Sequence, residues 1–348
     1  MKQVRIGFIG CGEIAEMHRE ALARIPEAAL CAVHDRDMGA AEAFAVRAGA
    51  QAVGDVAALL ADVSLDAVYI LTRHDSHPEL TIRAVVAGKA VFCEKPLALT
   101  VAEADAVVSQ VESAGATVMV GFSHRWDPVV RRAKAWADRQ ATPPMTLHVS
   151  FVTSPFLESW AGLPDEGGGV FHCLGSHAVD LAQYLMGRAF TRVEATQARL
   201  RLPEPYLPDT AALLLQADDG ALASALLHDH APVSYIQYVT GEDSHLLRAE
   251  LFGDGWAVVI DSLSRLRCYD AQGCHEVAVR CDSRIERFGI LAENQHFVQC
   301  VLQGAPPSPG VRDGASVVSL IETAAKTAQS RWGHIPQHEA VAAVRNSS

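Results

Sequence analysis

The sequence feature that most constrains the fold is a glycine-rich turn near the N-terminus. Gly10 and Gly12 directly follow a short apolar run, residues 4–9, and Ala15 lies in the helix-prone stretch that comes next. In such a pattern the backbone approaches a dinucleotide pyrophosphate closely, and the helix N-terminus supplies free amides and a positive dipole end. We therefore predict a dinucleotide site here. Its predicted cofactor-binding residues are Gly10, Cys11, Gly12, Glu13 and Ile14.

An acidic residue after the second predicted strand indicates which dinucleotide is bound. The strand, residues 30–33, leads to Asp35. An acid at this point hydrogen-bonds the adenosine ribose 2′-OH, and its charge repels a 2′-phosphate. Arg36 opposes this inference, because a guanidinium can hold that phosphate or stack on adenine. We predict NAD as the cofactor, with NADP less favoured, and both Asp35 and Arg36 as cofactor-binding residues. The alternative is a glycine turn that binds no ligand. The combined pattern favours a ligand site, because it includes a strand, a glycine turn, a helix start and an acid at the expected spacing.

Strand-like and helix-prone runs alternate through the first third of the chain, which predicts a parallel sheet covered on both faces. The runs are strands at 4–9, 30–33, 67–71, 91–93 and 117–120, and helices at 13–25, 40–47, 78–86 and from Thr100, where Glu103 completes a capping box. The pattern changes after about Phe122. It predicts helices at 128–139, 170–186, 287–302 and 314–332, an alternating strand at 146–153, and antiparallel strands with turns between residues 192 and 280.

These patterns predict an α/β protein with two domains. We expect residues 1–122 to form a Rossmann domain with a doubly wound parallel sheet. Residues 123–337 are expected to form a C-terminal α+β domain with a large, mostly antiparallel open sheet, its last helix packing back on the N-terminal domain. Residues 338–348 are expected to be a loosely held tail.

Charge and cysteine content argue against several classes of protein. The formal net charge of −12, without a Lys/Arg-rich run, gives the chain no general attraction for nucleic acid. No window offers the roughly 18 apolar residues that a membrane span needs, and the N-terminal apolar run is too short for a signal peptide. The eight cysteines include no C-x-x-C pair, so we expect a cytoplasmic protein rather than a disulfide framework.

Several further motifs, in a fixed order, carry a family resemblance. They are residues 9–12, 71–77, 87–89, 92–97, 121–128, 167–169 and 175–177. This order resembles the Gfo/Idh/MocA oxidoreductase family, named for glucose–fructose oxidoreductase and inositol dehydrogenase. The match covers nearly the whole chain and is densest through residue 187. The Glu94-Lys95-Pro96 segment after a strand, with the glycine motif upstream, is its most specific part.

The resemblance implies an NAD-dependent oxidoreductase acting on a secondary alcohol or ketone of a cyclic sugar, an inositol or a derivative. Family members place the nicotinamide between the two domains and make subunit contacts through the C-terminal sheet, so a homo-oligomer (dimer or tetramer) is expected. Lys95 and His177 match the family's catalytic lysine and histidine. The resemblance implies further cofactor-binding residues, which are Thr72, Arg73, His74, His77, Glu94 and Lys95.

The chemistry of alcohol oxidation is consistent with these roles. A histidine near neutral pKa can take the hydroxyl proton, and a lysine ammonium can stabilise the developing alkoxide. Arg125, Asp127 and Trp160 are candidates to grip a polyhydroxylated substrate. For Arg125 and Asp127 a structural ion pair is an equal alternative, Trp160 could belong to the core, and His177 could be a satisfied histidine on a helix face.

Position 173 departs from the family pattern. Many members carry an aspartate four residues before the catalytic histidine, and here that residue is Cys173, which we also place in the substrate site. Residues four apart share a helix face, so the change removes a charge beside His177. The neighbouring His172 can replace that aspartate only in part, because its side chain points about 100° round the helix from that of Cys173. A zinc site using Cys173, His177, His74 and His77 lacks an assignable ligand set, so no metal is predicted.

Two other functions remain open. A relative that retains NAD could cleave a glycosidic bond through transient oxidation, or move hydride between two sugars. A non-enzymatic NAD-binding regulator could share the architecture; Cys173 slightly favours it, and Lys95 and His177 argue against it. The expected partner is a small sugar or polyol, with no nucleic acid and no membrane.

Overall fold

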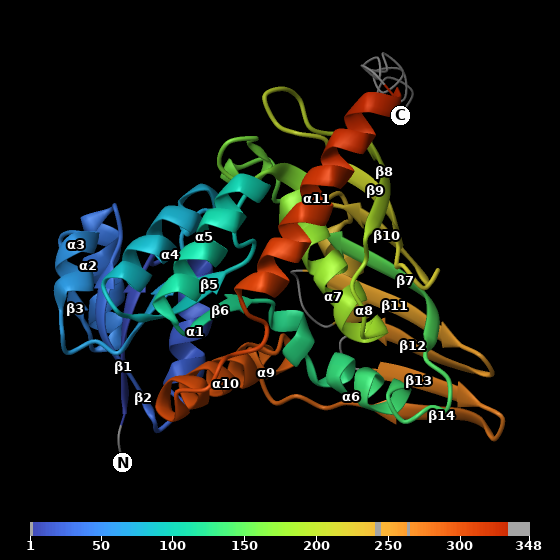
Figure 1. The fold of residues 1–348 in the computed structure, drawn as a ribbon, viewed down its shortest axis with the longest axis horizontal. Helices are drawn as coiled ribbons and strands as arrows, with labels where there is room; N and C mark the ends of the chain where they lie inside the picture. Colours follow the sequence, from blue (N-terminus) through green and yellow to red (C-terminus); the bar gives the residue numbers. More distant parts are fainter. Residues whose placement is uncertain (1–2, 241–244, 263–264, 333–348) are drawn as a thin grey trace.

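The structure is a computed structural model that describes residues 3–240, 245–262 and 265–332. It contains two β-sheets with helices packed on both, and the N-terminal sheet lies on the left in Figure 1. The predicted class is confirmed: a parallel sheet of six strands is joined to a mostly antiparallel sheet of eight. Residues 338–348, predicted to be a loose tail, lie outside the described residues.

The parallel sheet has the strand order β3-β2-β1-β4-β5-β6. Its strands are β1 (Val4–Ile9), β2 (Ala28–His34), β3 (Gln51–Ala52), β4 (Ala67–Ile70), β5 (Ala90–Glu94) and β6 (Val118–Gly121). Its helices are α1 (Glu13–Leu22), α2 (Met38–Ala48), α3 (Val56–Ala61), α4 (His77–Val86) and α5 (Val101–Ala114), with the predicted capping box at Thr100 and Glu103. The strand order changes direction between β1 and β4: β2 and β3 follow on one side of β1, and β4, β5 and β6 follow on the other. Doubly wound sheets bind their ligands at this point.

Part of the core of this sheet comes from far along the chain. Tyr69 on β4 and Phe92 on β5 stack with ring centroids 4.7 Å apart, and Phe297 meets both rings edge-on. Phe297 belongs to α10 (Ile290–Gln303), which also packs against α1. The C-terminal part of the chain therefore returns to cover the parallel sheet.

The second sheet has the order β14-β13-β12-β11-β7-β10-β9-β8, and only its β7–β10 pair is parallel. Its strands are β7 (Pro144–Thr153), β8 (Arg192–Ala198), β9 (Thr210–Gln216), β10 (Leu222–His228), β11 (His245–Gly253), β12 (Trp256–Ser262), β13 (Arg265–Asp270) and β14 (Gly273–Ala278). Helices α6 (Pro128–Ala137) and α7 (Ser176–Met186) pack on one face. Residues alternate between faces along a strand, so the other face presents the exposed side chains of Leu214, Leu226 and Phe252.

The longest helix, α11 (Val311–Trp332), joins the two sheets. It packs against β8 and α7 on one side and against α5 on the other, as the red helix in the centre of Figure 1 shows. The Glu322 carboxylate accepts a hydrogen bond of 2.8 Å from the Val101 amide at the start of α5. No helix in the described part of the chain is both long and apolar enough to cross a bilayer.

Several local predictions need correction. The helix predicted at 170–186 begins with a π-helical turn, Phe171–Gly175, before α7. The helix predicted at 287–302 is divided by Gly289, whose φ of +74° separates α9 (Arg284–Arg287) from α10. The sequence reading also missed β3, α3 and α8 (Val233–Thr240). The sequence of α8 is rich in β-branched and aromatic residues, which have a strand preference that tertiary context overrides here.

Candidate active site

One cleft of about 1010 Å³ connects the carboxyl ends of the parallel strands with the second sheet. One half is lined by the glycine turn after β1 and the loop after β4. The other half is lined by residues of β7, of the 3-10 turn Ser123–Trp126 and of the π-helical turn. Lys95 and His177 both line this space. The predicted dinucleotide site and the predicted catalytic pair therefore share one cleft.

The glycine turn has the geometry that close approach of a ligand requires. Gly10 has a φ of +100°, and a Cβ there would lie 2.4 Å from the Leu71 carbonyl oxygen, so only glycine fits. A Cβ on Gly12 would meet no atom within 4 Å, and no side chain caps α1 at this N-cap residue. The amides at the start of α1 are thus left available beside open space. Gly10, Gly12, Glu13 and Ile14 all line the cleft.

Asp35 lies beside this turn. Its Oδ2 accepts a 2.9 Å hydrogen bond from the amide of Cys11, and its Oδ1 accepts one from the amide of Asp37. Asp35 and Arg36 both line the cleft, whereas Cys11 does not. The backbone amide of Cys11, a residue predicted to bind the cofactor, fixes the position of Asp35.

The loop after β4 links the two halves of the cleft. Thr72, Arg73 and His74, all predicted to bind the cofactor, line it; Arg73 forms an ion pair with Glu166, and His74 Nδ1 lies 2.8 Å from the Gly167 carbonyl oxygen. Trp160 packs edge-on against His74, with ring centroids 5.0 Å apart, and also lines the cleft. The predicted position of Trp160 at the substrate site is therefore compatible with the structure.

His77 is a further residue predicted to bind the cofactor. It is fully buried and does not line the cleft. Its Nδ1 lies 2.7 Å from the Pro96 carbonyl oxygen and its Nε2 lies 3.1 Å from that of Thr72. His77 therefore ties the loop after β4 to the Glu94-Lys95-Pro96 segment rather than reaching the cofactor space.

A buried chain of hydrogen bonds fixes Glu94. Its Oε2 accepts from the amide of Lys95 at 3.1 Å, and its Oε1 lies 3.1 Å from His18 Nε2. The other ring nitrogen of His18 contacts the side-chain amide of Asn294 on α10. Sequence reasoning missed His18 and Asn294, since no motif marks either. A contact between residues 276 positions apart has no local signal.

Glu293 lies beside this chain. Both of its carboxylate oxygens are buried without a hydrogen-bond partner, and burial, followed by the charge of Glu94, holds its pKa well above the usual range. With His18 and Glu94 it forms a cluster whose ligand-type atoms lie within 4.8 Å of one another. A protonated Glu293 accounts for the packing of two carboxylates around one imidazole.

Lys95 and His177 both line the cleft, and the Lys95 ammonium acts on the His177 ring. Lys95 Nζ donates a 3.2 Å hydrogen bond to the Cys173 carbonyl oxygen, and no salt bridge to Lys95 is found among the described residues. His177 Nδ1 is buried without a partner. Burial, followed by the Lys95 ammonium, lowers the pKa of His177 well below its ordinary value. The imidazole is therefore neutral at neutral pH and has a nitrogen lone pair to accept a proton.

Two further histidines in the cleft were missed from the sequence. The ring of His124 lies 4.7 Å from that of His177 and 4.9 Å from that of His245, between centroids. Phe151 stacks on His177 and on His245. Burial lowers the pKa of His124 well below the usual range and that of His245 to about 3. His124 lies within residues 121–128, one of the segments that carry the family resemblance. The sequence analysis assigned substrate contacts only to its neighbours Arg125 and Asp127.

Arg125 and Asp127, predicted to grip the substrate, do not line the cleft. The Arg125 guanidinium donates to both carboxylate oxygens of Asp180 and to Asp313. Asp127 is fully buried, and its Oδ1 caps α6 by accepting a 2.8 Å hydrogen bond from the amide of Val129. The structural ion pair, one of the two readings of Arg125, is the one that the structure favours.

Cys173 lines the cleft but carries no charge. Its thiol donates to the carbonyl oxygens of Ala161 and Gly167, and burial raises its pKa to about 12. His172 is turned away, with its ring nitrogens 3.0 Å from Gly168 O and 2.9 Å from Leu99 O. Neither residue joins a group of three metal-ligand side chains within the described part of the chain. The zinc reading thus gains no geometric support.

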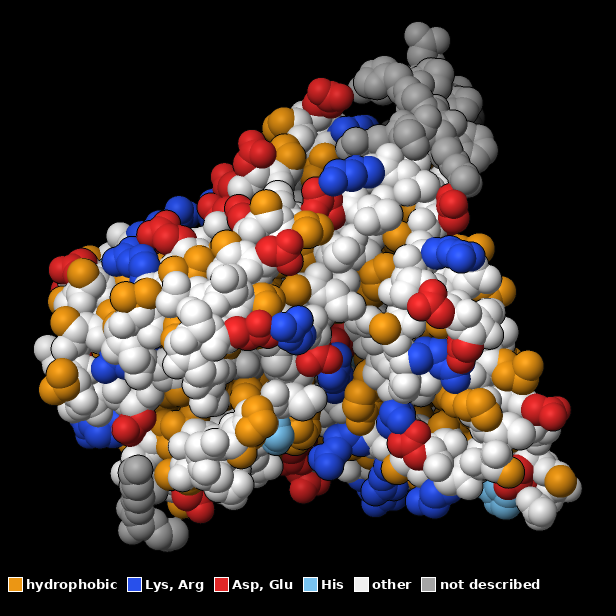
Figure 2. Space-filling view, viewed as in Figure 1, with side chains coloured by type: hydrophobic (Ala, Val, Ile, Leu, Met, Phe, Trp, Pro, Cys, Tyr) orange, Lys and Arg blue, Asp and Glu red, His pale blue; other side chains and the backbone are white. Residues whose placement is uncertain are grey.

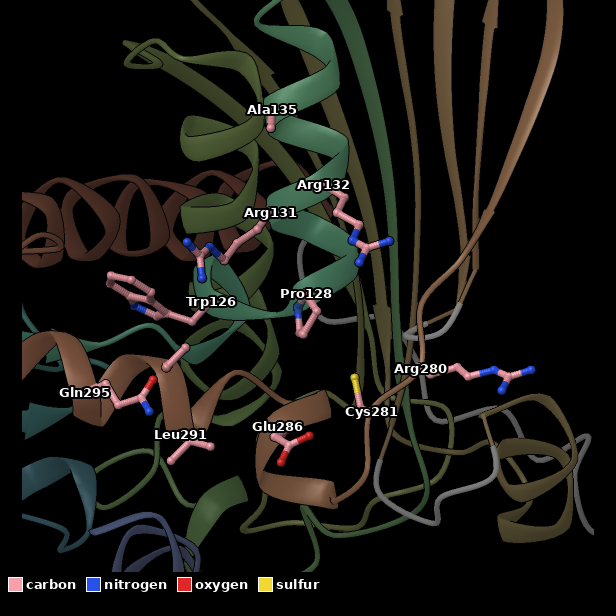
Figure 3. Close-up of a pocket in the computed structure, with 11 residues that line it drawn as sticks. Trp126, Pro128, Arg131, Arg132, Ala135, Arg280, Cys281, Glu286, Leu291 and Gln295 are labelled. Atoms are coloured by element: carbon pink, nitrogen blue, oxygen red, sulfur yellow. The ribbon is translucent and has the colours of Figure 1, made fainter. Parts of the chain in front are cut away.

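A second, smaller pocket of about 500 Å³ opens beside α6 (Figure 3). Figure 3 shows Arg131 directed toward Trp126, while Arg280 extends away from the other side chains. The Arg131 guanidinium lies 5.8 Å from the centre of the Trp126 ring system. Figure 2 shows basic side chains along the lower edge of the molecule. No acid–base pair comparable to Lys95 and His177 is found among the lining residues of this pocket.

Comparison with family models extends the motif resemblance to both parts of the chain. A model described as the Gfo/Idh/MocA oxidoreductase family, NAD-binding Rossmann fold, matches residues 4–122. A second, described as the GFO/IDH/MocA C-terminal domain, matches residues 130–256. Together these matches span more than half of the chain.

Individual relatives cover most of the sequence. An inositol 2-dehydrogenase of Rhizobium meliloti is 29% identical over 333 residues, which is 93% of this chain and 96% of the relative. The scyllo-inositol 2-dehydrogenase (NAD(+)) of Bacillus subtilis is 29% identical over 313 residues, 88% of each chain.

Solved structures agree with the fold. A protein of gentamicin A biosynthesis in complex with NAD aligns with a TM-score of 0.82 at 24% identity, covering 94% of this chain and 95% of that one. A levoglucosan dehydrogenase in complex with NADH and levoglucosan aligns with a TM-score of 0.84 at 21% identity, covering 94% and 98%. At these identities the likeness shows the fold alone.

Proposed function

Because the chain belongs to the Gfo/Idh/MocA family of oxidoreductases, we propose that it moves a hydride between NAD and a secondary alcohol or ketone of a cyclic sugar, an inositol or a derivative. The NAD-dependent dehydrogenase class follows from the family and its relatives. The substrate and the roles of Lys95 and His177 are the proposal. The observation that carries it is the single cleft that holds the glycine turn together with this pair.

The residues of the glycine turn fit the dinucleotide. Gly12 leaves open space at the start of α1, where amides and the helix dipole favour phosphates. Asp35 lies next to the turn, where an acid receives the ribose 2′-OH. When bound, NAD accepts the hydride from the alcohol carbon. Side chains of this protein take up the hydroxyl proton and stabilise the charge that develops on the alcohol oxygen.

Oxidation of a secondary alcohol also requires loss of the hydroxyl proton. We assign its removal to His177, whose neutral ring holds a buried nitrogen without a partner. We assign stabilisation of the developing alkoxide to Lys95, whose Nζ uses one hydrogen bond on the Cys173 carbonyl oxygen and can donate two more. Glu94 and His18 position Lys95 through its backbone amide.

We also propose that the open face of the second sheet joins copies of the chain. The exposed leucines Leu214, Leu222 and Leu226 lie on its neighbouring strands β9 and β10. Exposed apolar side chains grouped on one sheet face are typical of subunit interfaces. We place the boundary between the two domains near residue 122.

We further propose a cytoplasmic location. All eight cysteines are free, which fits a cytoplasmic protein.

The test is NADH formation across a panel of cyclic polyols and sugars, with mass spectrometry of any cofactor retained through purification. The proposal expects turnover with free NAD on at least one ring alcohol. Retained NAD that never dissociates would favour a glycosidase or a sugar–sugar oxidoreductase. Tight NAD binding without turnover on any member of the panel would favour a non-enzymatic regulator.

A further inference from the structure

The substrate half of the cleft is rich in cationic and hydrogen-bond-donating groups. Its nitrogen-bearing lining residues include Lys95, His124, His177, His245 and Arg284. Lysine and arginine side chains only donate hydrogen bonds, and each neutral imidazole has one donor and one acceptor. The carboxylates among the described lining residues belong to Glu13, Asp35, Asp75 and Glu94.

Only one of these four carboxylates, that of Glu13, meets a cation of the substrate half, the Arg284 guanidinium at 3.7 Å. Asp35 holds the backbone of the glycine turn. Glu94 is engaged by His18 and by the Lys95 amide. The side chain of Glu13 is 84% exposed at the start of α1, and Asp75 is an exposed residue of the loop after β4. The Cys173 thiol, with a pKa of about 12, adds no negative charge. Lys95 is thus left without a counter-charge among the described lining groups of this half.

Arg284 and the imidazoles form a continuous line through this half of the cleft. The Arg284 guanidinium lies 5.6 Å from the centre of the Phe288 ring, and Phe288 lies 4.8 Å from His245. His245 in turn packs against His124, and His124 packs against His177, with centroids 4.9 Å and 4.7 Å apart. The line therefore runs from a permanent cation to the proposed base.

Arg284 retains free hydrogen-bonding capacity. Its Nε is buried without a hydrogen-bond partner, and its guanidinium meets the exposed Glu13 carboxylate at 3.7 Å. A buried donor without a partner is costly, and an oxyanion is the group that satisfies it best. A ligand that carries only hydroxyl groups leaves Lys95 without a counter-charge, and it offers the Arg284 Nε a weaker acceptor than an oxyanion does.

We propose that the substrate carries an oxyanion, a carboxylate in the first instance, bound by Arg284 with His245 and His124 while its reacting hydroxyl lies at His177 and Lys95. The substrate class is thus a sugar acid or an acidic cyclitol rather than a neutral polyol. This inference rests on the proposed function and narrows it. A phosphate supplies the same chemistry, so the test includes both oxyanions.

The experiment compares matched rings that differ in one group: glucose, glucuronate and glucose 6-phosphate, and the corresponding galactose set. We expect kcat/KM for at least one anionic member to exceed that of its neutral partner by roughly tenfold or more, as a charge-assisted contact implies. A higher value for the phosphate than for the carboxylate identifies the oxyanion as phosphate. Equal or higher values for the neutral ring in both sets would overturn the proposal.

Substitutions at Arg284 and Arg287, both on α9, test whether Arg284 contacts the oxyanion of the substrate. Arg284→Gln should lower kcat/KM for the preferred anion by roughly tenfold more than it lowers the value for the matched neutral ring. Arg284→Lys, which keeps the charge, should retain most of the preference. Arg287→Gln, on the same helix but outside the cleft lining, is the matched control and should change neither value. An Arg284→Gln enzyme with weakened NADH binding and an unchanged anion preference would assign Arg284 to the cofactor and refute our assignment.

A binding measurement separates this inference from the proposed function. Calorimetric titration of the NADH complex with glucuronate and with glucose does not depend on turnover. Turnover of neutral rings only, with glucuronate bound no more tightly than glucose, would reject the oxyanion and keep the dehydrogenase. Tighter binding of glucuronate without NADH formation from any ring would reject the dehydrogenase and keep the oxyanion site.

Discussion

Replacing Cys173 by aspartate tests the electrostatics of the proposed base. The thiol is buried, stays protonated with a pKa of about 12, and lies one turn before His177. Because burial and the Lys95 ammonium lower the pKa of His177 well below its ordinary value, the wild-type imidazole is neutral through the physiological range. We therefore expect kcat/KM for alcohol oxidation to have no acid limb from His177 near pH 6.5. The limb should lie at clearly lower pH.

General electrostatics gives the direction and scale of the change. A carboxylate favours the imidazolium, so Cys173→Asp raises the pKa of His177 and moves the acid limb to higher pH. Side chains one turn apart lie roughly 5–6 Å from each other, and at an effective dielectric constant of about 20 a charge pair at this distance is worth about 3 kcal/mol. That corresponds to about two pKa units as an upper limit. The new carboxylate also contacts the Lys95 environment and loses solvation, so we expect about one unit.

The assay is the pH profile of kcat/KM for wild type, Cys173→Asp and Cys173→Asn on one confirmed substrate. The asparagine variant has nearly the same shape as aspartate without its charge, and its limb should stay at the wild-type position. His177→Ala should abolish the limb and lower kcat/KM by roughly 10²–10⁴. Coincident limbs for the aspartate and asparagine variants would refute the electrostatic reasoning. Full activity in His177→Ala would remove His177 from the mechanism.

Four further predictions concern the cofactor, the lysine, the buried ion pair and the open sheet. NADH should bind at least roughly tenfold more tightly than NADPH, about 1.4 kcal/mol, in a fluorescence titration, and Asp35→Asn should narrow this gap; equal affinities in the wild type would show that Arg36 dominates. Lys95→Ala should lower kcat by roughly two orders of magnitude with NADH affinity within a few-fold, and a variant that keeps most of its turnover would contradict the role given to Lys95. Asp180→Asn leaves the buried Arg125 with the half-exposed Asp313 alone and should reduce the free energy of unfolding by about 3 kcal/mol or more in urea titrations, whereas Asp313→Asn should cost much less; equal losses would be inconsistent with the burial difference. Leu226→Lys on the open sheet should dissociate the proposed oligomer in sedimentation experiments, while Val63→Lys, at a residue 96% exposed beside the parallel sheet, should leave it intact; an unchanged sedimentation coefficient in both would place the interface elsewhere.

The fold was largely predictable because its signals are local. The strand, glycine turn and helix start of residues 4–15 occupy consecutive positions, and the capping box of Thr100 and Glu103 spans one helical turn. Alternating runs then imply a parallel sheet without any knowledge of long-range contacts. Where local preference and tertiary packing disagree, as in α8, the prediction failed.

The site was only partly predictable because many of its contacts join distant residues. Arg125 finds Asp180 and Asp313, 55 and 188 positions away, and these partners decide that it is structural rather than substrate-binding. The pair of His18 and Asn294 is equally remote. His124 and His245 meet only when β11 lies against β7. No spacing rule within one segment contains this information.

The uncharged residue at position 173 connects the mechanism with substrate choice. An aspartate there would compensate the Lys95 charge and raise the pKa of His177, and so would set both the ligand that fits and the pH at which the base works. With Cys173 the base is neutral and the lysine lacks a counter-charge among the described lining residues, so an anionic substrate brings a negative charge into this half of the cleft at the moment of binding. Its arrival raises the pKa of His177 in the complex, which strengthens the base just before it takes the proton. The acid limb of kcat, which reports the complex, should therefore lie at higher pH than the limb of kcat/KM for an anionic substrate, and the two limbs should coincide for a neutral one.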